Sequence, residues 1–114
     1  MSFTQKSSGH IAIQKEGCCF CCCCYLGGLN TIQEVDDCFC WAIQKENNYV
    51  RSSDSWVNID KNRLANLSAK HYNRTRRSGT ITTNRKRSHF WVEDNGKEVY
   101  NSVRPNLGIN YFPI

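Results

Sequence analysis

Residues 89–101 read His-Phe-Trp-Val-Glu-Asp-Asn-Gly-Lys-Glu-Val-Tyr-Asn, and this stretch decides the fold. Its centre, Asn95-Gly96, is the dipeptide that best supplies the two positive φ angles of a type I′ turn between antiparallel strands. On both sides of the turn the chain is rich in aromatic and β-branched residues, which favour strands. The stretch therefore predicts a β-hairpin over about residues 88–103.

Upstream of the hairpin, the sequence predicts one more strand and two helices. Thr80–Thr83 has strand composition. One helix is predicted to start at Asp36-Asp37, because acidic residues stabilise a helix N-terminus, and to run through Glu46. The other is predicted to start after Asp60 and to fade near residues 71–73. Its apolar side comprises Leu64, Ala65, Leu67 and Ala69. These elements predict an α+β fold, in which a cysteine-bearing helix packs on a small antiparallel sheet that ends in the hairpin.

The N-terminal third is less regular. Residues 10–14 are expected to form a short strand, and Cys18–Leu26 is apolar without a helical period, which favours a buried strand. Gly27-Gly28 ends this run. We therefore expect a cysteine-rich segment at 1–35 and a core at 36–114, joined in one compact unit.

Composition bounds the kind of protein. A chain of 114 residues and 13.2 kDa has the length of a single domain. It holds no apolar run near the roughly 18 residues of a membrane span, and residues 1–9 lack the apolar core of a secretory signal. All eight cysteines lie before residue 41, too clustered for a disulfide framework. We expect no transmembrane span, a reducing compartment and a cytoplasmic location.

Cys40 is the first candidate for chemistry. If a helix starts at residues 36–37, Cys40 lies in its first turns, where free amides and the helix dipole lower a thiol pKa. A nucleophilic cysteine also needs a base, and His89 is that candidate. In the predicted hairpin Trp91 lies opposite or near Tyr100. Asn101 then falls roughly across from His89, where its side chain can fix the imidazole tautomer.

Several of these motifs resemble known families. Cys40-Trp41-Ala42 resembles the nucleophile signature of papain-like peptidases, and residues 89–93 with Asn101 resemble the histidine strand and third-residue strand of the transglutaminase-like core. The order of elements and the end of the chain are also similar to small leader peptidases of lasso-peptide biosynthesis, over residues 36–114. The third residue of that core is usually Asp, whereas this chain has Asn101.

The resemblance implies a cysteine peptidase or acyl-transfer enzyme that acts on a peptide or protein substrate and needs no cofactor. Cys40 would attack the amide, His89 would move the proton, and Asn101 would orient the imidazole. The Cys40 amide and Gln33 would stabilise the oxyanion, although Gln33 is one residue off the papain spacing. Cys38 stays open as the alternative thiol, because its surroundings also match ovarian-tumour-type deubiquitinases.

The cysteine cluster supports two other interpretations besides a buried apolar strand. Cys-x-x-Cys and Cys-x-Cys pairs could supply four thiolates to zinc, and a run of cysteines resembles an S-acylated string that holds a protein on a membrane surface. A thiolate that binds zinc cannot act as a nucleophile. The zinc candidates are Cys18, Cys21, Cys38 and Cys40, and the acylation candidates are Cys21, Cys22, Cys23 and Cys24.

Positive charge is concentrated in residues 61–92, which hold nine Lys or Arg and no acid. Two arginine-rich clusters near aromatic residues could follow a phosphate backbone. The alternative function is therefore a cysteine-rich, basic nucleic-acid-binding protein, regulatory or viral. The block could equally guard a strand edge or recruit an acidic peptide beside an active site. Its candidate contacts are Arg74, Arg76, Arg77, Arg85, Lys86 and Arg87.

Overall fold

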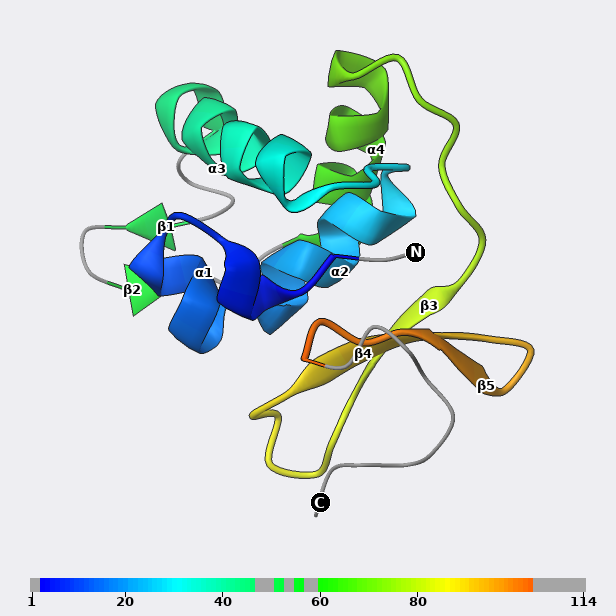
Figure 1. Ribbon diagram of the computed structural model, residues 1–114. Helices are drawn as coiled ribbons and strands as arrows, with labels where there is room; N and C mark the ends of the chain where they lie inside the picture. The colour runs from blue at the N-terminus through cyan, green and yellow to red at the C-terminus, as the bar shows by residue number, and fades with distance from the viewer. Residues whose placement is uncertain (1–2, 47–50, 53–54, 57–59, 104–114) are drawn as a thin grey trace.

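The computed structural model describes residues 3–46, 51–52, 55–56 and 60–103 (Figure 1). Within that part, helices and an antiparallel sheet form the predicted α+β fold, with a helix packed on the sheet. The elements in chain order are the 3-10 helix η1 (Gln5–Ser7), α1 (Ile11–Glu16), α2 (Cys18–Leu26), α3 (Ile32–Glu46), β1 (Arg51–Ser52), β2 (Ser55–Trp56), α4 (Lys61–His71), β3 (Thr80–Thr83), β4 (Phe90–Asp94) and β5 (Lys97–Tyr100).

The predicted hairpin is confirmed. Strands β4 and β5 pair antiparallel, and Asn95 and Gly96 connect them with φ angles of 54° and 78°. The strand predicted at Thr80–Thr83 is also confirmed, because β3 pairs with the other edge of β4. The sheet order is β3-β4-β5, so the strand that follows His89 lies in the middle.

The helix predicted after Asp60 is confirmed as α4. The Asp60 side chain accepts a hydrogen bond from the backbone N–H of Arg63 at 3.1 Å, which is an N-terminal cap. The side of α4 that faces the core includes the buried Leu64, Ala65 and Ala69. The predicted apolar side therefore turns toward the protein interior, except that Leu67 is only half-buried.

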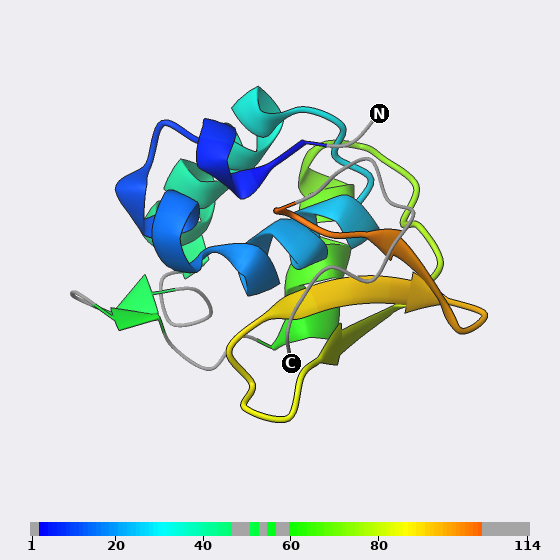
Figure 2. The same cartoon turned by 60° about the horizontal axis from the view of Figure 1, so that its bottom comes forward.

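Residues 18–26 form a helix, where a strand was expected. All of α2 except Cys19 and Tyr25 is buried. A helix that is apolar all round has no amphipathic period, so the sequence pattern could not reveal it. Helix α2 packs against β4 and α4, and it lies between α3 and the sheet in both views (Figures 1 and 2). It is thus the cysteine-bearing helix on the sheet, in the place expected for the helix of Cys40.

Two further boundaries differ from expectation. Residues 11–16 form helix α1 where a strand was expected. Helix α3 starts at Ile32, because Thr31 and Glu34 form a capping box: the Thr31 hydroxyl accepts from Glu34 N at 3.2 Å, and the Glu34 carboxylate accepts from Thr31 N at 3.3 Å. The expected division between residues 35 and 36 therefore falls inside α3, and residues on both sides of it share one core.

None of the helices that the structure describes is both long and apolar enough to cross a membrane.

Candidate active site

His89 and Asn101 meet at the start of the central strand. The Nε2 atom of His89 lies 3.0 Å from the Oδ1 atom of Asn101, and Asn101 is fully buried. The same oxygen accepts a hydrogen bond from the backbone N–H of Val103 at 3.3 Å. Because a backbone N–H can only donate, this bond fixes which end of the Asn101 amide faces His89. Nε2 of His89 must then carry a proton, and Nδ1 becomes the proton-accepting nitrogen of the neutral ring.

A β-bulge puts Asn101 on the same side of the sheet as His89. Val92 pairs with Tyr100 while Glu93 pairs with Glu98, so Val99 is the extra residue on β5. Without it, continued pairing would set Asn101 opposite Phe90 and therefore on the other face. With the extra residue, continued pairing sets Asn101 opposite Trp91. Asn101 is then a diagonal neighbour of His89 on the same face of the sheet.

Trp91 holds the imidazole from the side. The two rings are stacked with centroids 6.0 Å apart and an interplanar angle of 23°. The indole N–H of Trp91 donates to Glu93 Oε2 at 2.8 Å, which fixes the indole in turn. The His89 ring is thus restrained by a hydrogen bond at one edge and by an aromatic face.

The structure does not bring Cys40 to this pair. Cys40 lies more than two turns inside α3, away from the free amides of the helix start. Its thiol is exposed, and Sγ lies 3.5 Å from Nε2 of His10. Gln33 is exposed in the first turn of α3, and this helix lies on the far side of α2 from the sheet (Figures 1 and 2). The dipole argument for Cys40 therefore fails, because α3 starts four residues earlier than expected.

Cys38, the alternative thiol, is enclosed in the core. Its Sγ lies 3.4 Å from the Ser68 hydroxyl. A hydrogen bond from the Cys24 thiol lowers the pKa of Cys38, and burial opposes that change. Enclosure between α2 and α4 keeps this thiol from a peptide substrate.

The cysteine that does meet the sheet beside His89 is Cys18, which the sequence analysis missed as a nucleophile. It is the first residue of α2, it follows Gly17, and its side chain is 8% exposed. Burial raises the pKa of the Cys18 thiol, while a hydrogen bond from the backbone N–H of Phe90 lowers it. Phe90 directly follows His89 in the chain, so the Cys18 thiol contacts the backbone one residue after the candidate base.

Cys19, the next residue, lies in a different electrostatic environment. It is half-buried, and a hydrogen bond from the Cys23 thiol lowers its pKa against the effect of burial. The cationic side chains of Lys61 and Arg87 lower that pKa further. The first turn of α2 therefore offers one thiol beside the His89 strand and a second beside two cations.

One signal in the sequence could have located this turn. Residues 18–26 are an uninterrupted apolar run bounded by Gly17 and Gly27, with a length that fits a short buried helix as well as a long strand. A helical interpretation would have put Cys18 in a first turn, where thiols are activated.

The cysteine cluster is part of the core. Cys21, Cys22, Cys23 and Cys24 each have no exposed surface, so the folded chain presents none of the acylation candidates to an acyltransferase. The zinc candidates do not converge either: Cys18 is at the sheet, Cys38 is at Ser68, and Cys40 is at His10. No group of three or more His, Cys, Asp or Glu within the described ranges is arranged to hold a metal ion.

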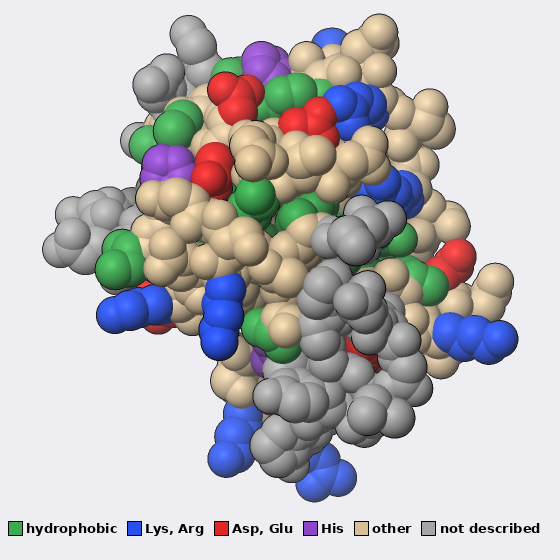
Figure 3. All heavy atoms as spheres, in the orientation of Figure 1, with side chains coloured by type: hydrophobic (Ala, Val, Ile, Leu, Met, Phe, Trp, Pro, Cys, Tyr) green, Lys and Arg blue, Asp and Glu red, His purple; other side chains and the backbone are tan. Residues whose placement is uncertain are grey.

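The basic block divides into a structural part and an exposed part. Arg74 forms an ion pair with Glu34, Arg76 donates to the side chains of Asn62 and Asn66, and Arg77 donates to backbone carbonyls. By contrast, Arg85, Lys86 and Arg87 are exposed in the β3–β4 turn. In Figure 3, Lys and Arg side chains project from the lower end of the molecule, where Figure 1 places that turn.

Comparison with protein-family models, with curated proteins and with solved structures finds no match to this chain.

Proposed function

We propose that this chain is a cysteine peptidase or acyl-transfer enzyme whose nucleophile is Cys18, with His89 as the base and Asn101 as the residue that orients it. The observation that carries the proposal is the 3.0 Å contact between His89 Nε2 and Asn101 Oδ1, at the strand end against which the Cys18 thiol packs. A thiol, an imidazole and a polar group that orients the imidazole are the parts that nucleophilic catalysis by cysteine needs.

The proposed chemistry assigns one role to each of these residues. Nδ1 of His89 takes the thiol proton, and the Cys18 sulfur attacks the carbonyl carbon of an amide to give a tetrahedral oxyanion. The backbone N–H groups in the first turn of α2 are the donors that we assign to that oxyanion. The imidazolium then gives its proton to the leaving amine, and a thioester remains on Cys18. Attack by water releases an acid, and attack by a second amine completes an acyl transfer.

Cys18 is preferred to Cys19 and Cys40 for a geometric reason. Only Cys18 among them has a described contact with the strand that carries His89, through the Phe90 amide. Cys19 faces Cys23 and two cations, and Cys40 is paired with His10. Burial raises the pKa of the Cys18 thiol. In the proposed reaction this thiol therefore reacts through proton transfer to His89 and does not rest as a free thiolate.

The test is the burst of p-nitrophenolate that accompanies acylation by p-nitrophenyl acetate, with the acylated residue located by mass spectrometry. We expect a burst and an acetyl group on Cys18 in the parent, and no burst in Cys18→Ala or His89→Ala. The matched controls, Cys40→Ala and His71→Ala, alter an exposed thiol and an exposed imidazole and should keep the burst. A burst that persists in Cys18→Ala but disappears in Cys19→Ala would overturn the assignment of Cys18.

A further inference from the structure

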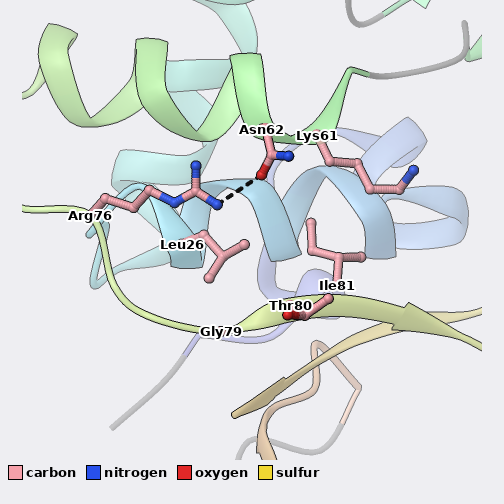
Figure 4. A pocket seen from close by; sticks show the side chains of 7 residues that line it. All are labelled: Leu26, Lys61, Asn62, Arg76, Gly79, Thr80 and Ile81. Carbon is pink, nitrogen blue, oxygen red and sulfur yellow. Dashed lines mark hydrogen bonds between the residues drawn. The ribbon is translucent and has the colours of Figure 1, made fainter.

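A pocket of about 220 Å³ opens beside the N-terminus of α4, and neither His89 nor Asn101 lines it (Figure 4). Apolar side chains of Leu26 and Ile81 line it. The close view shows Arg76 on one side of these residues and Lys61 on the other. The remaining lining residues are Asn62, Gly79 and Thr80, so no acidic side chain contributes to it.

Both cations keep their charge uncompensated by the described part of the chain. The ion pair of the described residues joins Arg74 to Glu34 and involves neither pocket cation. Arg76 is held in place by two amide oxygens, those of Asn62 at 2.9 Å and Asn66 at 2.7 Å, which are neutral. An oriented guanidinium with unused donors is suited to bind a carboxylate.

Lys61 connects the pocket to Phe90 and to the first turn of α2. Its stem lines the pocket, and its ammonium lies 5.7 Å from the centroid of the Phe90 ring. Lys61 and Arg87 are also the two cations that act on the Cys19 thiol. Positive charge therefore extends from the pocket, past Lys61, to the first turn of α2 and the exposed β3–β4 turn.

We propose that this pocket binds a carboxylate of a peptide substrate, so that the enzyme acts on acidic peptide segments. The inference rests on the proposed function and names its substrate class. Arg76 and Lys61 would hold the carboxylate while Leu26 and Ile81 contact the neighbouring apolar part of the peptide. The carboxylate could come from an acidic side chain or from the C-terminus, and the experiment separates the two.

The test is fluorescence anisotropy with the full-length Cys18→Ala variant, which binds peptide but cannot turn it over. The probes are a fluorescein-labelled, glutamate-rich peptide with an amidated C-terminus, its glutamine counterpart, and that counterpart with a free C-terminus. We expect the glutamate-rich peptide or the free C-terminus to bind about tenfold more tightly than the amidated glutamine peptide. Whichever probe shows the preference identifies the source of the carboxylate.

The same measurement on Lys61→Gln and Arg76→Gln should remove most of that preference. Lys70→Gln is the matched control, because Lys70 is exposed on the same helix and the charge change is identical. Equal binding of all three peptides, or an equal loss in Lys70→Gln, would overturn the proposal. Tighter binding of a labelled oligouridine through Lys61 and Arg76 would also overturn it, in favour of nucleic acid. Because binding needs no catalysis, none of these results depends on the burst experiment.

Discussion

The Nε2 atom of His89 is 3.0 Å from Oδ1 of Asn101, and that oxygen also accepts the backbone N–H of Val103. A fully buried amide, held by the backbone just after β5, therefore sets the tautomer of a histidine at the start of β4. The contact depends on the hairpin turn, on the bulge at Val99 and on burial of the amide. Each of these can be disturbed separately.

Removing the amide should slow the reaction of Cys18. In Asn101→Ala the His89 ring loses the acceptor that keeps Nε2 protonated, so Nδ1 is less often available as the base. We expect the rate of iodoacetamide labelling of Cys18 near pH 6.5 to fall about tenfold or more, measured by mass spectrometry of quenched samples. Labelling of Cys40, which pairs with His10, should not change.

The conservative variant separates positioning from stability. Asn101→Asp retains an oxygen acceptor for both His89 and Val103, so it should restore most of the Cys18 labelling rate. Thermal unfolding of both variants accounts for the loss of a buried side chain. If Asn101→Asp labels as slowly as Asn101→Ala at equal stability, the amide does not position the base.

The hairpin turn offers a test of the fold itself. Gly96 has a φ of +78°, and no atom lies within 4 Å of where its Cβ would stand, so Gly96→Ala introduces backbone strain without a clash. We expect a loss of about 1 kcal/mol in the free energy of unfolding, measured by urea titration. Asn95→Gly, at the neighbouring positive φ, should lose far less. Equal effects of the two variants would contradict a type I′ turn.

Local patterns in the sequence predicted the elements that local forces determine. The Asn95-Gly96 turn and the Asp60 cap are short-range features, and both are confirmed. The start of α3 was also readable, since Thr31 and Glu34 form a capping box, although the acidic pair at residues 36–37 drew the prediction four residues too far along.

The missed parts depend on tertiary structure. Helix α2 is buried almost all round, so its sequence shows no amphipathic period. Which cysteine-bearing helix packs on the sheet is decided by long-range packing, and for that reason Cys40 was chosen over Cys18. The sequence predicted that Asn101 reaches His89, and the two side chains do meet, but the predicted register of Trp91 opposite or near Tyr100 is shifted by one residue: Val92 pairs with Tyr100, because of the bulge at Val99, which has no sequence signature.

The buried thiols predict a loss of stability at alkaline pH. Burial raises the pKa of Cys21, Cys22 and Cys24 in the folded chain, whereas an unfolded thiol has a pKa of about 8.5. Their contribution is therefore complete below about pH 8 and is lost as the pH rises, because only the unfolded chain then releases thiol protons. Each thiol adds at most about 1.4 kcal/mol of destabilisation per pH unit.

Urea unfolding between about pH 7.5 and pH 10, under reducing conditions, checks this slope. Cys22→Ala should show a shallower decline than the parent, because one shielded thiol is gone. Cys40→Ala should match the parent, because that thiol is exposed in the folded chain. A free energy of unfolding that stays constant across this range would show that the thiols are not shielded.

Arg77 should contribute to stability where Lys86 does not. Nη1 of Arg77 donates to Tyr25 O at 2.7 Å and Leu29 O at 2.8 Å, and the Cζ atom of Arg77 lies 4.4 Å from the Tyr25 ring centroid. Tyr25 is in the last turn of α2 and Leu29 lies just after it, where backbone acceptors lack helical partners. We expect Arg77→Gln to lower the free energy of unfolding by about 2–4 kcal/mol in urea titrations, since charged hydrogen bonds are lost and carbonyls are left buried. Arg77→Lys should recover only part of this, because an ammonium has no second nitrogen to donate to Asn30 Oδ1 as Nη2 of Arg77 does. Lys86→Gln, in the exposed β3–β4 turn, should stay within about 0.5 kcal/mol of the parent. Equal stability of the Arg77 and Lys86 variants would mean that the basic block is a surface feature throughout, and nucleic-acid binding through all of it would again become the better explanation of its charge.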